Sequence, residues 1–251
     1  MALERVILNR EKLADAVGDR WSDAELSEAL ALLTRADGRF PAGVRTLPAD
    51  LVKAVQRERL LAAMIGAATD IGYSTLTVQN VLTRAGISRP TFYEQFEDKE
   101  DCFLAAFDAA AGRMRARIKV AVLDAGPTWR DQLRSGIAEL LRFIVDEPEE
   151  ARMVIVEARA SCPAGLHRRD DLLDHFAGCV DALVREDLDE PPSAIAAAGV
   201  VGGIESVLYA RLQKGETEDF DALLPSLMYF AVLSYAGREA AGEEMDDAAL
   251  A

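Results

Sequence analysis

Along most of the chain, apolar residues recur at intervals of three and four, the spacing of a helix that buries one face. A first helix is expected from Ser22 to about Ala36, because Ser-Asp-Ala-Glu at its start is a capping-box sequence. A second is expected from about Asp50 to Ile71, with Gly72 ending it. No stretch alternates apolar and polar residues long enough to require a strand, so the pattern predicts an all-α fold.

From Thr77 onward the predicted elements become short. We expect Thr77 to cap one short helix and Ser88 another, with Gly86 supplying the turn between them. Pro90 then falls in the first turn of the second helix, where its missing N–H costs no hydrogen bond. A long helix is expected to start at Asp98. Five later helices, separated by prolines and glycines, are expected at residues 128–146, 149–160, 164–188, 193–213 and 219–236.

Composition indicates in which cellular compartment the protein is expected. Half of the residues are apolar and 6% are aromatic, which favours a helical protein with a substantial core. No run approaches the roughly 20 apolar residues of a membrane span, and the first residues are charged throughout, unlike a signal peptide. The three cysteines are scattered, so no disulfide framework is implied. We therefore expect a cytoplasmic protein without a membrane segment.

The net charge of −15 is unevenly distributed. The last fifty positions before the final alanine hold 3 basic and 10 acidic residues. Between Asp70 and Glu94, by contrast, there is no carboxylate, and the charged residues are Arg84 and Arg89. A locally basic segment on an acidic body permits DNA binding without proving it.

The two short helices around Gly86 form a candidate helix-turn-helix. The apolar side chains expected to pack inside this unit are Val78, Val81, Leu82, Ile87, Phe92 and Phe96. Those expected to point outward are Ser88, Arg89, Thr91, Tyr93 and Gln95, with no carboxylate among them. Arg89 is the candidate for a bidentate contact to guanine, and Gln79 and Lys99 are candidates for flanking phosphates. On spacing alone, an ordinary corner of a helical bundle explains the two helices equally well.

The tetracycline-repressor (TetR) family has a DNA-binding domain that is similar to the stretch LTVQNVLTRAGISRPTFYEQFEDKEDCFLAAFD, and its first helix is similar to QRERLLAAMIGAATDIGYSTLT. The resemblance covers about residues 55 to 110. It implies a ligand-responsive transcriptional regulator, typically a repressor, that binds a palindromic DNA operator as a homodimer and is released by a small-molecule effector. It also implies that the DNA contacts come from Thr77, Gln79, Ser88, Arg89, Thr91, Tyr93 and Lys99.

Three parts are expected. Residues 1–50 form an atypical N-terminal extension with one or two helices and a basic arm, residues 51–105 the helix-turn-helix domain, and residues 106–251 an effector-binding and dimerisation domain. The extension departs from the family pattern. Its Arg39 and Arg45 either follow a minor groove or belong to a segment that packs on the protein.

Residues 106–251 resemble the family only in the arrangement of their expected helices. Four large apolar residues are candidates for the walls of a pocket for an unknown, partly apolar effector, or alternatively for plain core: Trp129, Phe143, Met153 and Phe176. The two closing helices are expected to pair with their copies in a dimer, or alternatively to pack within one chain. The candidate interface residues are Val200, Val201, Ile204 and Leu208.

Other chemistry has little support. His167, Asp171, His175 and Cys179 share a helix face at intervals of four, a pattern that occurs in metal sites, but arginines and aspartates crowd it, and we predict no metal and no cofactor. With two histidines and no nucleophile–base arrangement, we predict that the protein is not an enzyme. The alternative to a regulator is a helical adaptor or small-ligand binding protein that has lost DNA affinity.

Overall fold

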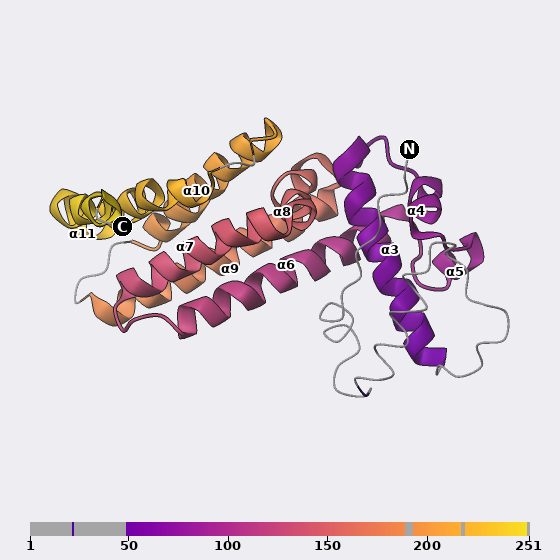
Figure 1. Ribbon diagram of the computed structural model, residues 1–251, viewed down its shortest axis with the longest axis horizontal. Coiled ribbons are helices and arrows are strands. Elements are labelled where there is room, and N and C mark those ends of the chain that lie inside the picture. Colours follow the sequence, from indigo (N-terminus) through magenta and orange to yellow (C-terminus); the bar gives the residue numbers. More distant parts are fainter. Residues whose placement is uncertain (1–21, 23–48, 189–192, 217–218, 250–251) are drawn as a thin grey trace. The chain divides into compact units, whose positions relative to one another are not determined.

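The computed structural model describes Ser22 and residues 49–188, 193–216 and 219–249 (Figure 1). These residues form helices and turns, with no strand among them, which confirms the predicted all-α fold. The helix predicted at 22–36 and the basic arm lie outside the described residues. The chain divides into two compact units between Phe107 and Asp108, which are described separately here.

The first unit contains α3 (Ala49–Ile71), α4 (Val78–Ala85), α5 (Arg89–Tyr93) and the start of α6 (Lys99–Leu123). The predicted helix ends are confirmed. Gly72 ends α3 in the left-handed region, with φ 75°, and Gly86 does the same for α4, with φ 63°. The Thr77 side chain accepts from the Asn80 backbone N–H, and the Asn80 side chain accepts in return from the N–H of Thr77, so α4 has a capping box.

Aromatic side chains fill the core of this unit. Phe92 and Phe103 are fully buried and Phe96 nearly so, and the Phe92 and Phe96 rings lie 5.6 Å apart. From the other side, the Arg57 guanidinium of α3 stacks 4.5 Å from the centre of the Phe96 ring. Arg59, two residues further along α3, donates to the carbonyl of Ala85 at the end of α4. The long helix α3 therefore holds both short helices in place.

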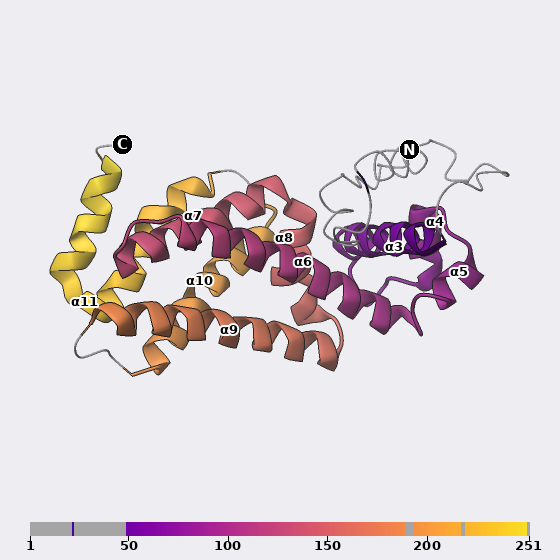
Figure 2. The same cartoon turned by 90° about the horizontal axis from the view of Figure 1, so that it is seen from below.

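The second unit continues α6 from Asp108 and adds α7 (Trp129–Asp146), α8 (Pro148–Ile155), α9 (Pro163–Asp187), α10 (Ile195–Gln213) and α11 (Leu224–Ala249). Two short 3-10 helices, η2 (Glu157–Ala160) and η3 (Asp221–Leu223), join them. The closest backbone packing is between α9 and α10, α7 and α11, and α7 and α9. Figure 2 shows α9 along one side of the unit and α6 with α7 along the other.

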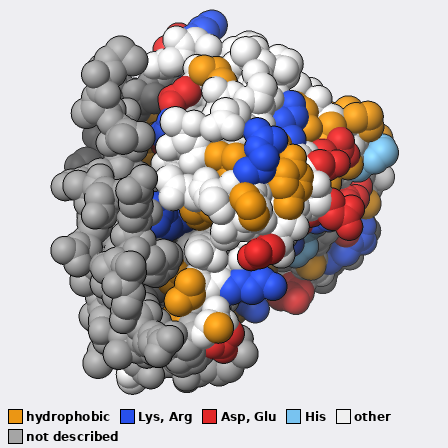
Figure 3. Space-filling model, turned by 90° about the vertical axis from the view of Figure 1, so that its right-hand side faces the viewer, with side chains coloured by type: hydrophobic (Ala, Val, Ile, Leu, Met, Phe, Trp, Pro, Cys, Tyr) orange, Lys and Arg blue, Asp and Glu red, His pale blue; other side chains and the backbone are white. Residues whose placement is uncertain are grey.

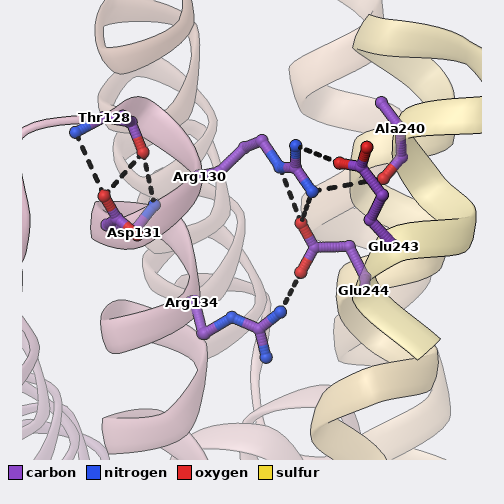
Figure 4. Close-up of polar contacts among 7 residues, drawn as sticks. All are labelled: Thr128, Arg130, Asp131, Arg134, Ala240, Glu243 and Glu244. Carbon is purple, nitrogen blue, oxygen red and sulfur yellow. Dashed lines mark hydrogen bonds and ion pairs between the residues drawn. The ribbon is translucent and has the colours of Figure 1, made fainter. Parts of the chain in front are cut away.

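The helix α11 is longer than the predicted 219–236. It breaks at Gly237, which has φ 81°, and resumes as a helix that folds back on the start of α7. Figure 4 shows the anchor: the Glu244 carboxylate accepts from Arg130, at 2.7 Å, and from Arg134. Because Glu244 is only 1% exposed, this pair of arginines supplies the hydrogen bonds that its burial requires.

Candidate DNA-binding surface and apolar cavity

The outer side of α4 and α5 carries uncharged and cationic side chains. Gln79, Thr83, Ser88 and Arg89 are exposed, and the Tyr93 ring is 50% exposed beside the buried Phe92. Figure 3 looks at the molecule from the side on which α4 and α5 lie, and shows Lys and Arg side chains among uncharged and apolar ones, with some Asp and Glu side chains beside them. This is the composition of a surface that meets phosphates and base edges.

Arg89 is held in a defined position at the start of α5. Its guanidinium donates to Gln79 Oε1 across the turn, at 3.1 Å, and the Gln79 amide in turn donates to Thr83 Oγ1 at 3.3 Å. Thr83 itself donates to the backbone carbonyl of Gln79 at 2.8 Å. The chain of hydrogen bonds orients Arg89 over the seam between the two helices while its other donors face solvent.

The hydroxyl groups predicted to contact DNA also have structural partners. Ser88 Oγ and Thr91 Oγ1 lie 2.9 Å apart, and Ser88 accepts from the Thr91 backbone N–H as the cap of α5. Thr77 caps α4. A hydroxyl that caps a helix keeps a further lone pair or proton for a phosphate, so the DNA contacts of these three residues remain predictions.

The Lys99 side chain, predicted to contact a phosphate, makes contacts within the protein. Its ammonium group donates to the carbonyl oxygens of Tyr73 and Leu76, both at 3.0 Å, and lies 4.0 Å from the centre of the Tyr73 ring. These contacts tie the start of α6 to the loop between α3 and α4. The predicted role at DNA is untested, and the bracing role was not visible in the sequence.

The other cation of this stretch, Arg84, is engaged within the fold. It forms an ion pair with Asp70, and its guanidinium crosses α3 at Gly66, where a Cβ atom would come within 2.6 Å of three guanidinium atoms. A Cβ at this position would displace the Arg84 side chain from this path. Arg89 is therefore the cation of α4 and α5 that remains available for a ligand.

The second unit encloses an apolar cavity of about 140 Å³. Its walls come from α6, α7, α8, α9 and α10, and along α9 they extend from Arg169 to Leu183, about 21 Å at 1.5 Å per residue. A cavity this long with so little volume is narrow. Representative wall residues are Ile118, Val122, Gly136, Leu172, Phe176 and Ile204.

A charged cluster borders the cavity where α9 meets α10. Glu205 is nearly buried and accepts from Arg169, at 3.0 Å, and from Arg159. Arg169 also pairs with Asp170 at 2.7 Å. Because these groups satisfy one another, the cluster leaves no unpaired charge facing the cavity, and the surface offered to a ligand is almost entirely hydrocarbon.

Of the four predicted pocket residues, only Phe176 lines this cavity. Trp129 instead packs edge-on against Tyr235, with ring centres 5.6 Å apart, and Phe143 lies under the Arg117 guanidinium. Met153 is fully buried in the core. The wall residues that the sequence did not indicate are aliphatic or small, such as Gly136, whose added Cβ would lie 3.1 Å from Val122.

The predicted dimer residues occupy the inner face of α10. All four line the cavity, and three of them, Val200, Ile204 and Leu208, are buried within the chain. For these three the alternative of packing within one chain holds, while Val201 is half-buried and the dimer interface stays a prediction. The outer side of α10 carries the exposed Ile195, Ala198, Gly199, Ser206 and Val207 and the half-buried Gly202.

The stripe of residues considered as a metal site lies on α9. Cys179 Sγ and His175 Nε2 are 3.9 Å apart, and both side chains are exposed. Within the described ranges, no three histidine, cysteine or carboxylate side chains come together as a metal site.

Comparison with known proteins agrees with this geometry. Residues 60–106 match the model of the bacterial regulatory proteins of the tetR family, while no curated protein matches the chain. The fatty acid degradation regulator FadR from Bacillus halodurans is 18% identical, with a TM-score of 0.64 over 70% of this chain and 94% of that one. FadR from Bacillus subtilis in complex with stearoyl-CoA is 19% identical, with a TM-score of 0.63 over 71% and 97%.

A TetR-like transcriptional regulator from Rhodococcus sp. RHA1 is 22% identical, with a TM-score of 0.61 over 72% of this chain and 95% of that one. At these identities the likeness establishes a common fold, and the family match covers residues 60–106, from within α3 to the start of α6. The helix-turn-helix of α4 and α5 therefore lies in a segment that matches the model of the bacterial regulatory proteins of the tetR family, and the described chain shares the fold of the regulators named above.

Proposed function

We propose that the protein is a cytoplasmic, ligand-responsive repressor that binds a palindromic operator as a homodimer and leaves it when an apolar effector enters the cavity. The observation that carries the proposal is the exposed Arg89, oriented by Gln79 on a carboxylate-free pair of short helices that matches the family model. In this arrangement α5 enters the major groove, and Arg89 donates to the O6 and N7 atoms of a guanine.

The cavity supports an effector with a slender hydrocarbon part. FadR from Bacillus subtilis binds stearoyl-CoA on the same fold. Here the volume of about 140 Å³ is close to that of the engineered cavity of about 150 Å³ that takes up benzene. A longer chain therefore fits only if the walls separate, and a ligand that prefers the separated state shifts the population toward it.

The helix α6 supplies the link that this mechanism needs. It contributes Met114, Ile118 and Val122 to the cavity wall and begins at Lys99, in the DNA-binding unit. It is not among the helices with close backbone packing, so its position depends on side chains around the cavity and on ion pairs such as Arg113 with Glu150. A displacement of α6 by ligand changes the spacing of the two recognition helices in a dimer.

The exposed face of α10, continued by Phe230 and Leu233 of α11, supports the dimer. Ile195 is 77% exposed and Val207 41%, and a Cβ added at Gly199 or Gly202 would meet nothing within 4 Å, so another helix can approach closely. Among the described helices, α10 is also the one long and apolar enough to span a membrane by length and composition, with a third of that stretch buried in the fold. Burial against a second copy accounts for the same apolar side chains.

Two measurements test the proposal. Fluorescence anisotropy of the protein with its own upstream intergenic DNA and with a scrambled duplex should show tight, sequence-selective and salt-sensitive binding. Equal weak binding to both duplexes, and no selection from a random duplex library, would show that the DNA function is absent. Gly202→Glu and Val207→Glu should each produce monomers in sedimentation, with Lys214→Glu on the far end of α10 as control, and dimers that survive both changes would refute the interface.

A further inference from the structure

The last helical segment of the chain crosses a helix that forms one wall of the cavity. Residues 238–249, at the end of α11, fold back on the first turns of α7, where Arg130 and Arg134 hold them (Figure 4). Arg130 pairs with Glu243 at 2.9 Å, and both arginines pair with Glu244. We call residues 238–249 the C-terminal strap.

The strap and the cavity act on the same turns of α7. Leu133 and Gly136 of α7 line the cavity. Each of them lies within one turn of Arg130 or Arg134 along the helix. Across the cavity, Gly136 comes close to Val122 of α6, because an added Cβ would lie 3.1 Å from it. The strap therefore holds the part of α7 that closes the cavity against α6.

A break at one residue joins the strap to the rest of α11. Gly237 has φ 81° and ψ −175°, a combination that residues other than glycine rarely adopt. Nothing lies within 4 Å of the position that a Cβ would take there, so glycine is required by the backbone conformation and not by lack of space. The direction of the strap therefore depends on two dihedral angles.

The strap is attached mainly through Glu244. Ala241 is fully buried and Glu244 is 1% exposed, whereas the Glu243 side chain is 61% exposed. A buried carboxylate that loses its cationic partners is strongly unfavourable. Any movement of α7 that separates Glu244 from Arg130 and Arg134 therefore costs free energy, and the attachment favours the closed cavity.

We propose that the C-terminal strap sets the size of the ligand that the cavity accepts, by holding α7 in the closed position. This rests on the proposed function. At about 140 Å³ the closed cavity takes up a molecule of the size of benzene. A larger ligand binds after α7 has separated from α6, which requires release of the strap. Its apparent affinity is therefore reduced by the small fraction of molecules in which the strap is free.

Two variants of the full-length protein release the strap by different means. Gly237→Ala favours a straight α11 and keeps every side chain that makes the attachment. Glu244→Gln removes the charge that the two arginines hold. Gly242→Ala is the matched control, because Gly242 lies within the helical strap and an added Cβ meets nothing within 4 Å. Melting curves check that each variant folds.

Binding is measured with two uncharged probes, benzene by calorimetry and the larger N-phenyl-1-naphthylamine by fluorescence. Both strap variants should bind the larger probe about tenfold more tightly than the wild type, because the stabilisation that the closed state loses is gained in apparent affinity. The affinity for benzene should not change, and Gly242→Ala should match the wild type with both probes. Slower maleimide labelling of Cys179 identifies the cavity as the place where the larger probe binds.

Amide hydrogen exchange tests the same coupling in the wild type. A ligand that binds only when the strap is free must itself favour the free strap. Saturating N-phenyl-1-naphthylamine should therefore speed exchange in residues 238–249, and benzene should not. Equal affinity of the wild type and both variants for the larger probe, or strap exchange that is the same with both probes, would overturn the strap and leave the cavity and the regulator intact. If neither probe binds while operator binding persists, the effector cavity is refuted, and the strap with it.

Discussion

Arg89→Ala separates DNA recognition from folding more cleanly than any other change in this chain. Arg89 is exposed, stands at the first position of α5, and has one hydrogen bond, to Gln79 at 3.1 Å. Exposed substitutions of this kind alter the free energy of unfolding by no more than about 0.5 kcal/mol. The loss caused by the truncation should therefore appear in DNA binding alone.

The size of that loss follows from the proposed contact. A bidentate arginine–guanine pair contributes about 1–3 kcal/mol at each half-site, so a dimer on a palindrome loses about 2–6 kcal/mol, or roughly 30-fold to 20,000-fold in affinity. Gln79→Ala keeps the guanidinium and removes only its orienting partner. It should cost less, about 0.5–1.5 kcal/mol per half-site.

The assay is anisotropy at several salt concentrations with the operator and with duplexes in which each guanine is replaced in turn. If Arg89 reads a base, the variant loses discrimination at one position of each half-site and keeps the salt dependence of the wild type. If it holds a phosphate, all duplexes weaken equally and the slope of log K against log salt falls by about 0.9 per lost contact. The second result, or a loss no larger than that of Lys214→Ala, would refute base reading by Arg89.

Four further predictions concern the fold and the cavity. Phe92→Ala should destabilise the DNA-binding unit by about 3–5 kcal/mol in denaturant unfolding, because the ring is fully buried. Glu244→Gln should cost about 2 kcal/mol, since the α7 arginines that it pairs with are partly exposed and regain water. Tyr235→Phe should be neutral or stabilising, because the phenol oxygen is buried without a partner among the described residues. Burial also raises the pKa of Tyr235 to about 12. Because the unfolded chain releases this proton first, the wild type should lose stability between pH 10 and 12, whereas the variant should not. Maleimide should label the exposed Cys179 rapidly. It should label the buried Cys102 only on unfolding, because burial raises the pKa of that thiol. A cavity ligand should protect Cys179, and labelling of Cys179 at the same rate with and without ligand would contradict its place in the cavity wall.

The features that the sequence predicted well are those with a local cause. The Thr77 and Ser88 caps, the left-handed Gly72 and Gly86, and the first-turn Pro90 each depend on atoms within a few residues. Such signals act in the same way in any surrounding structure. The helix-turn-helix could therefore be placed to within a residue or two before any tertiary contact was known.

The features that it missed depend on distant partners. The prediction ended the last helix at residue 236, whereas α11 resumes after Gly237. What holds the second segment is Glu244 against Arg130 and Arg134, more than one hundred residues away in the sequence. Lys99 is a similar case, since its two carbonyl partners lie in a loop that only the fold brings near.

Size was also a poor guide to the cavity. The prediction chose large apolar side chains as its walls, yet large side chains fill space, and Phe143 and Met153 are fully packed core. A cavity forms where the side chains are too small to meet. Gly136 marks such a place, because α7 has no side chain there to close the gap toward Ile118 and Val122.

The helix α10 shows why its sequence does not distinguish a cavity wall from a dimer face. It is apolar nearly all the way round, so its periodicity has no polar side from which to orient it. In the structure Val200 and Ile204 close the cavity, whereas Val207 is exposed and Gly202 half-buried on the face that we propose for a second copy. Substitutions on the two faces should then have separable effects, on ligand affinity for the inner face and on oligomeric state for the outer one. Because both faces belong to one rigid helix, a ligand that displaces the inner face also shifts the surface proposed to join the two subunits, which gives a second route, besides α6, from the cavity to the spacing of the recognition helices.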